Sequence, residues 1–227
     1  MRKISAIEVL LGILVLVAWT SQGLFFGSFL HSLLPPVNYR STAVVLLTGS
    51  WLLSTHLIFY GLLVQTCLKL PEGEIPIGGA IERRYHLRLI LQFFVIHPLL
   101  RSNVLPVPLS RQVYKVLGAK MGENSYTSGM IFDPDFVELG ENVLLGHGSV
   151  LIPHVIENSR LAHHRIRIGD RVTLGAHAVV MAGAVIGNDA IIAVNSVVTK
   201  NTRIEAGEVW GGVPARKLKT RESSTGP

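Results

Sequence analysis

The chain has 227 residues, of which 48% are hydrophobic and 16% charged, and its formal net charge is +6. This composition is too apolar for an intrinsically disordered protein and unusual for a soluble one. The single cysteine, Cys67, excludes a disulfide framework and any zinc site built on cysteines. Residues 1–120 hold 11 Lys/Arg against 4 Asp/Glu, whereas residues 121–227 hold 10 against 11. The second half therefore offers no basic face for nucleic acid, and we expect no nucleic-acid partner.

Two long apolar stretches, at about 9–30 and 43–64, open the chain. Each is long enough to cross the roughly 30 Å hydrocarbon core of a bilayer. Basic residues precede the first stretch and follow the second, which places both ends of the pair on the cytoplasmic side. We therefore expect residues 1–70 to form a transmembrane helical hairpin.

The segment 71–120 is expected to contain an interfacial helix and a linker. Residues 81–101 combine an apolar run, too short to span a bilayer, with the basic residues Arg83, Arg84 and Arg88. This combination is typical of a helix that lies at a membrane surface, and a third buried helix is the alternative. Three prolines, Pro98, Pro106 and Pro108, then predict the linker.

A six-residue repeat begins at Ile168. Cut into hexads, the chain reads IGDRVT, LGAHAV, VMAGAV, IGNDAI, IAVNSV, VTKNTR, IEAGEV and WGGVPA. The first position is large and apolar every time, and the fifth is small or β-branched in the first six hexads. An in-phase run covers residues 139–156 and extends back through DPDFVE to MGENSY at Met121. Such a period indicates a solenoid.

Six residues make a short strand and a tight turn, so three sides close a triangular coil of 18 residues. The first-position aliphatic residue then points inward, and the fifth position meets the inside corner. Glycine recurs at the second position, as in Gly169, Gly175 and Gly187. We expect these glycines to permit turn conformations that a Cβ atom would forbid.

This pattern resembles the hexapeptide-repeat, left-handed β-helix acyltransferases, over residues 121–218. A closer resemblance is to the β-helical domains at the C-terminus of polylysine-synthetase-like peptide synthetases. Those domains show a Gly-Ala-Lys-x-Gly segment, here 118–122, and an Asp-Pro-Asp-hydrophobic-Val segment, here 133–137. The resemblance implies an all-β left-handed parallel β-helix behind the hairpin and the interfacial helix. Residues 219–227 are expected to be a disordered tail.

The resemblance also implies a reaction. It is acyl transfer from a coenzyme A thioester, with acetyl-CoA or another acyl-CoA as co-substrate and no permanently bound cofactor, to a hydroxyl or amine. A histidine with a pKa near neutrality suits the role of general base. The family's sites lie between three subunits, which implies a homotrimer. The hairpin adds a multi-pass location in the bacterial inner membrane, a catalytic domain on the cytoplasmic side, and a membrane-associated acceptor: a glycan, a lipid-linked molecule or a peptide.

One clear break interrupts the repeat, because residues 157–167 obey no hexad. We expect a loop there, and the family carries its catalytic histidine beside such a loop. His154 matches that position best. His163 and His164 stand where the serine acetyltransferase pattern would place its histidine, so these two remain alternatives.

A base histidine usually needs a carboxylate to orient it. Glu157 is three residues from His154. Asp135 lies about one 18-residue coil before His154, on the same face. Both are candidates. For the tetrahedral oxyanion, the backbone N–H of a turn glycine such as Gly175 is a candidate donor.

The coenzyme A phosphates of the family lie along the last coils. Basic side chains gather at that end of the sequence and are candidates to neutralise the phosphates: Lys200, Arg203, Arg216 and Lys217.

Two other functions deserve comparison. The γ-carbonic anhydrases share the fold and bind zinc through three histidines, two of them five residues apart. No two histidines of this chain have that separation, so we expect no metal site. The alternative from another class is a non-catalytic trimerising scaffold for a membrane biosynthetic complex. Such a scaffold needs neither His154 nor a loop that breaks the repeat.

Overall fold

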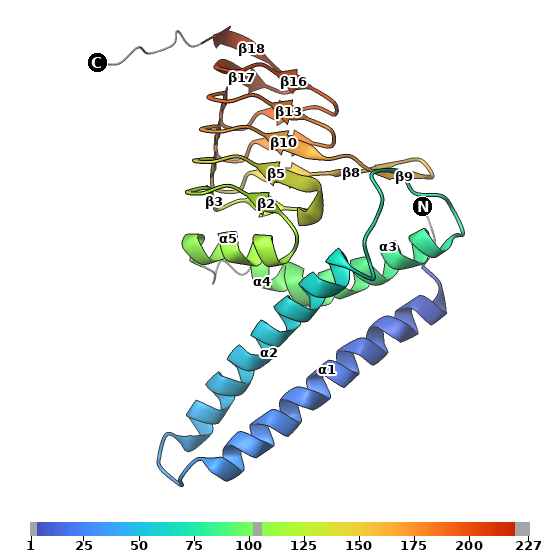
Figure 1. The fold of residues 1–227 in the computed structure, drawn as a ribbon, viewed down its shortest axis with the longest axis vertical. Helices are drawn as coiled ribbons and strands as arrows, with labels where there is room; N and C mark the ends of the chain where they lie inside the picture. The colour runs from blue at the N-terminus through green and yellow to red at the C-terminus, as the bar shows by residue number, and fades with distance from the viewer. Residues whose placement is uncertain (1–3, 102–105, 221–227) are drawn as a thin grey trace.

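The computed structural model describes residues 4–101 and 106–220 and is elongated (Figure 1). A helical hairpin forms one end, and a stack of short strands forms the other. A helical segment that follows the hairpin crosses between these two parts. The order of the parts along the chain agrees with the order expected from the sequence.

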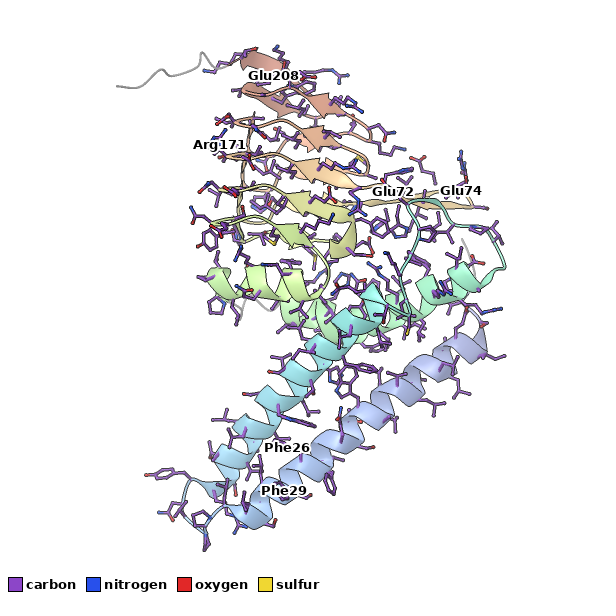
Figure 2. All side chains as sticks on the ribbon, in the orientation of Figure 1. Phe26, Phe29, Glu72, Glu74, Arg171 and Glu208 are labelled. Atoms are coloured by element: carbon purple, nitrogen blue, oxygen red, sulfur yellow. The ribbon has the colours of Figure 1, made fainter. Side chains whose placement is uncertain are left out.

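The hairpin consists of α1 (Ala6–Leu33) and α2 (Arg40–Gln65). Ser5 caps α1, and its side chain and that of Glu8 form a reciprocal capping box. By length and composition both helices could cross a membrane, and most of their apolar side chains are exposed. Phe29, which is 52% exposed, illustrates this near the end of the hairpin farthest from the strands (Figure 2).

The predicted interfacial helix forms as one continuous segment. It comprises α3 (Ala80–Leu91), the π-helical η1 (Gln92–Ile96) and α4 (His97–Arg101). Arg83 and Arg84 are exposed, as a surface helix requires. Arg88 is not on that surface, because it is 2% exposed and binds carboxylates of the strand domain. An interfacial role for Arg88 is therefore wrong.

The second half of the expected linker also forms a helix, α5 (Val107–Val116). Pro106 is its N-cap and Pro108 lies in its first turn, where a missing N–H costs nothing. The buried side chains of Val113 and Tyr114 join the core, and the Tyr114 hydroxyl accepts a hydrogen bond from the N–H of Ile131. The helix closes the end of the strand stack nearest the hairpin (Figure 1).

Three parallel sheets form the sides of the stack. The first joins, in spatial order, β16 (Arg203–Ile204), β13 (Val185–Ile186), β10 (Ile166–Ile168), β5 (Val137–Leu139) and β2 (Lys120–Met121). The second joins β17 (Glu208–Gly212), β14 (Ile191–Ile192), β11 (Thr173–Leu174), β6 (Leu144–Leu145) and β3 (Tyr126–Thr127), and the last strand, β18 (Ala215–Thr220), pairs antiparallel with β17. The third joins β15 (Val197–Val198), β12 (Val179–Met181), β7 (Val150–Ile152) and β4 (Met130–Ile131).

The interior of the stack follows the hexads. First-position residues such as Leu174, Val180 and Ile192 are 0% exposed, and the fifth-position residue Ala178 is too. From β10 onward, partners in successive coils are 18 residues apart, as in the pairing of Thr173 with Ile191. These pairings confirm a three-sided hexapeptide-repeat coil with parallel strands, and the pattern is consistent with a left-handed β-helix.

The glycines of the second position have a different cause from the one expected. Gly175 does not have positive φ; instead, a Cβ atom on it would lie 2.5 Å from the backbone N of Val194 in the next coil. Positive φ occurs at the fourth position, as in Arg171 (56°), His177 (57°) and Asp189 (61°). Close stacking of coils, rather than turn conformation, therefore requires glycine at the second position.

Residues 157–167 are more ordered than the expected loop. β8 (His154–Glu157) and β9 (Arg160–His163) form an antiparallel hairpin, and β1 (Gly73–Glu74) extends it into a three-stranded sheet. Arg160 and Glu74 form an ion pair of 2.9 Å across this sheet. The hairpin is thus fixed to the segment that follows α2.

At the other end of the chain, Lys219 and Thr220 lie in β18 rather than in a tail. The remaining residues of the expected tail, 221–227, lie outside the described residues.

Candidate functional site

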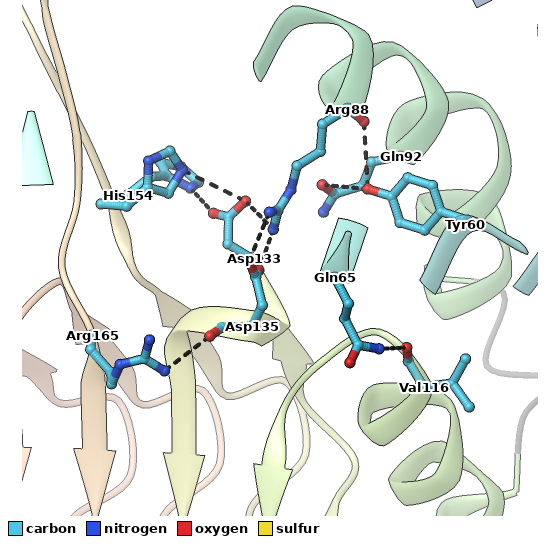
Figure 3. Close-up of polar contacts among 10 residues, drawn as sticks. Tyr60, Gln65, Arg88, Gln92, Val116, Asp133, Asp135, His154 and Arg165 are labelled. Atoms are coloured by element: carbon cyan, nitrogen blue, oxygen red, sulfur yellow. Dashed lines mark hydrogen bonds and ion pairs between the residues drawn. The ribbon is translucent and has the colours of Figure 1, made fainter. Parts of the chain in front are cut away.

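A histidine–aspartate pair lies where the β8–β9 hairpin leaves the coil and α3 crosses it (Figure 3). His154 begins β8, and its Nδ1 is 2.6 Å from Oδ2 of Asp133. Since a carboxylate only accepts hydrogen bonds, Nδ1 carries the proton and Nε2 of the neutral ring keeps its lone pair. The His154 side chain is 27% exposed, so the pair combines a fixed orientation with access.

Asp133 owes its position to an irregular first coil. Ile131 is 1% exposed and fills the interior place, and the 3₁₀ turn η2 (Pro134–Phe136) takes up the residues before β5. Asp133 lies between them with φ 43° and ψ 66°, a left-handed conformation that non-glycine residues adopt at a cost.

Arg88 brings a positive charge from α3 to this corner. Its Nη1 donates to Oδ2 of Asp135 at 2.9 Å, and its Nη2 binds the other oxygen of Asp135 and lies 3.5 Å from Oδ1 of Asp133. Figure 3 shows the guanidinium between the two carboxylates. The site is therefore assembled from the helical part and the β-helix together.

The electrostatics keep Asp133 ionised. Burial alone would raise the pKa of Asp133, but the hydrogen bond from His154 and the charge of Arg88 outweigh it, and the pKa lies far below its usual range. An ionised Asp133 holds the His154 ring in one tautomer and stabilises the imidazolium that a proton transfer creates.

His163 is buried rather than accessible. It is 0% exposed, stacks on Phe136 with ring centroids 4.9 Å apart, and has Nε2 3.9 Å from Oδ1 of Asp133. Burial lowers its pKa to about 4, so the ring is neutral at pH 7. His164 is half-buried, and its backbone N–H donates a hydrogen bond to Pro153 O at 2.9 Å. Of the three candidate histidines, His154 is the one that faces the cavity described below.

The neutral His163 predicts a loss of stability in weak acid. The unfolded imidazole takes up a proton below about pH 6.5, while the folded one resists protonation until about pH 4. The contribution of His163 to the free energy of unfolding is therefore fully present above pH 6.5. It falls by up to about 3 kcal/mol as the pH drops toward 4. Unfolding in detergent at pH 7, 6 and 5 measures it. His163→Phe should flatten the curve over this range, and an equal slope in the variant would contradict the assignment.

A cavity of about 250 Å³ adjoins the pair. His154 and Asp133 line one side, and residues of α3 and η1 line the other. A molecule in this cavity would contact the His154 side chain directly.

The other candidate residues lie elsewhere. Glu157 pairs with Lys200, and Asp135 pairs with Arg88, so the structure places Asp133, and neither of these two, against His154. The sequence pattern does not single out Asp133, because the hexad DPDFVE reads as in phase with the repeat. Its signal is an aspartate in a first position that is otherwise large and apolar.

The proposed oxyanion donor is already engaged, because the N–H of Gly175 donates to Ile192 O at 2.8 Å. That role for Gly175 is wrong.

The basic side chains proposed for the coenzyme A phosphates differ in their contacts. Lys217 pairs with Glu208 at 2.5 Å, whereas Arg203 and Arg216 are exposed. Within residues 4–101 and 106–220, no group of three or more His, Cys, Asp or Glu side chains could hold a metal.

A family comparison agrees with the repeat. Residues 165–200 match the bacterial transferase hexapeptide family model of six repeats. The hexapeptide repeat covers β10 to β15, the regular coils that follow the β8–β9 hairpin.

Parts of the chain are also similar to curated proteins and to solved structures. The mitochondrial γ-carbonic anhydrases 1 and 2 of Arabidopsis thaliana are 36% and 35% identical to the chain over 81 residues, 36% of this chain and 25% of theirs. The chain thus spans about a quarter of the length of these curated relatives. A hexapeptide-repeat acetyltransferase of Vibrio cholerae, solved with acetyl coenzyme A, is 24% identical over 47% of this chain and 62% of that one, with a TM-score of 0.43. A galactoside acetyltransferase solved with coenzyme A is 19% identical over 74% of this chain and 82% of that one, also with a TM-score of 0.43.

Proposed function

We propose that the protein is a membrane-anchored acyltransferase that moves an acetyl or other acyl group from a coenzyme A thioester to a hydroxyl or amine. The observation that carries the proposal is the His154–Asp133 pair beside a cavity, next to a bacterial transferase hexapeptide repeat. The donor is the one that the resemblance to hexapeptide-repeat acyltransferases implies.

In this reaction His154 Nε2 accepts the proton of the acceptor as its oxygen or nitrogen attacks the thioester carbonyl. The new C–O or C–N bond forms, the C–S bond breaks, and the proton on His154 passes to the leaving thiolate. Asp133 stabilises the imidazolium in between, because its carboxylate stays ionised and within 2.6 Å of Nδ1. The acyl group passes directly to the acceptor, so the reaction needs neither a covalent acyl-enzyme nor a cysteine.

The membrane anchor is the α1–α2 hairpin, and we place both chain ends in the cytoplasm of a bacterial cell. The support is the length and exposure of the helices and the basic residues on their flanks. A reporter fused after the last residue should be active only in the cytoplasm.

We also propose a homotrimer with the coenzyme A groove between subunits. A detergent-corrected mass equal to three chains is the expected measurement.

The test of the proposed function is consumption of acetyl-CoA by the purified full chain in detergent or nanodiscs. With labelled acetyl-CoA and a panel of hydroxyl- and amine-bearing acceptors, we expect label in an acceptor and release of free coenzyme A. Both signals should fall together, by about 10²-fold or more, in His154→Ala. If the folded protein neither binds nor consumes acetyl-CoA with any acceptor, the acyltransferase proposal fails and a scaffold role replaces it.

A further inference from the structure

The helical wall of the cavity contains a buried histidine without a hydrogen-bond partner. His97 lines the cavity and is 7% exposed, and neither of its ring nitrogens has a partner in the described part of the chain. Its neighbours are aromatic: the ring of Phe93 lies 4.8 Å away and that of Phe132 5.2 Å away, both edge-on. Buried polar groups are nearly always satisfied. His163 also lacks a hydrogen-bond partner among the described residues, but only His97 of these two lines the cavity, where a ligand could supply the bond.

The π-helical turn η1 explains how His97 reaches the cavity. It interrupts the regular α-helix immediately before His97, and Phe93 and His97 both line the cavity across this turn. π-helical turns within α-helices occur frequently at functional sites. The helix irregularity and the unsatisfied side chain thus lie at the same point.

Beside the polar side chains of Tyr85, Arg88 and Gln92, the cavity has apolar lining that reaches the outside. Leu89 and Ile156 line the cavity, and so does Phe93, which is 56% exposed. A second cavity, of about 150 Å³, shares Leu89 and Ile156 with the first and extends to Ile4, just before α1. An apolar surface therefore runs from His154 to the point where the hairpin begins.

The charged groups of the cavity are engaged with each other. Arg88 binds the two aspartates, and Asp133 binds His154. Burial lowers the pKa of His97, so its ring is neutral. The polar part of the cavity therefore suits a hydroxyl or amine rather than a phosphate or carboxylate.

We propose that the cavity binds the head group of a membrane amphiphile, with His97 hydrogen-bonded to the head group and the apolar chain against Leu89 and Phe93. The inference rests on the proposed function and narrows its acceptor to a lipid-linked molecule that enters from the bilayer. A soluble glycan or a peptide would not need the apolar wall. His97 acts here as a specificity residue: it contacts the acceptor, whereas His154 takes the proton that is transferred.

The experiment measures binding rather than turnover. The full chain in nanodiscs is irradiated with an alkyl glucoside that carries a diazirine in its chain, and the labelled peptides are identified by mass spectrometry. We expect label in residues 80–101, protection by octyl glucoside, and none by methyl glucoside at the same concentration. Phe93→Ser should reduce labelling about tenfold, since it removes apolar contact area. The matched control is Phe94→Ser, because Phe94 is 67% exposed on the same turn but does not line the cavity.

His97 has its own pair of variants. His97→Leu should reduce labelling about tenfold through the lost hydrogen bond, and His97→Asn should recover part of it. Thermal unfolding of each variant confirms that it is folded. Equal losses in Phe93→Ser and Phe94→Ser, or equal protection by methyl and octyl glucoside, would overturn the inference even if acetyl-CoA is consumed. Labelling that behaves as expected in a protein that never consumes acetyl-CoA would instead remove the proposed function and leave the amphiphile site.

Discussion

Replacing His154 with alanine is expected to lower the rate of acyl transfer by about 10²-fold or more, the usual contribution of a general base. The fold should persist, because the His154 side chain is 27% exposed and lies outside the coil interior. Asp133→Asn should also lower the rate, since an amide can donate to Nδ1 and so favour the wrong tautomer. Asparagine is the suitable replacement because it tolerates the left-handed backbone of residue 133.

The control for His154 is His177→Asn. His177 lies at a corner of a regular hexad, with φ 57°, and its ring contacts that of His147 rather than the cavity. Turnover by this variant should match the unmodified protein. If His154→Ala kept full turnover while His163→Ala or His164→Ala abolished it, the base would be reassigned. If all three turned over normally, general-base catalysis by histidine would be excluded.

Replacing Arg88 with methionine is expected to cost about 3–5 kcal/mol of unfolding free energy, the usual penalty for removing one partner of a buried ion pair. The guanidinium is 2% exposed and contacts two carboxylates, which would remain buried without it. Burial alone would lower the pKa of Arg88, but Asp135 outweighs this and raises it, so the charge is present at any pH of interest. Arg88→Lys should recover only part of the loss, because an ammonium cannot bind Asp135 through two parallel bonds.

Thermal or chemical unfolding in detergent measures the Arg88 effect. Arg84→Met is the matched control, because Arg84 is exposed one turn earlier on α3, and surface changes usually stay within about 0.5 kcal/mol. Adding Asp135→Asn to Arg88→Met should restore part of the stability. Equal losses for Arg84→Met and Arg88→Met would show that the carboxylates do not depend on Arg88.

The regular elements were predictable because their patterns are local. The two apolar runs predicted the hairpin helices, with bounds that agree within a few residues. The six-residue repeat that begins at Ile168 predicted the coils. The break in the repeat also marked His154, the one of the three candidate histidines that lines the cavity. Its role as a base stays a prediction.

The rest depended on contacts between distant segments. Asp133 reaches His154 only because the first coil is irregular, and the in-phase reading of residues 121–138 concealed it. Arg88 looks like a lipid-facing cation beside Arg84, and only the docking of α3 on the coil shows that it is buried. The pairing of β1 with β9 joins segments about 90 residues apart, which no local pattern of charge or hydropathy indicates.

The two ends of the β-helix determine whether it can grow into a fibre. A parallel coil exposes unpaired N–H and C=O groups at both ends, and identical coils of another chain could stack there without limit. The α5 helix occupies one end, and at the other β18 runs antiparallel to β17. The exposed cations Arg216 and Lys219 of β18 would repel an approaching copy. The chain thus keeps a repetitive, self-complementary architecture from end-to-end polymerisation.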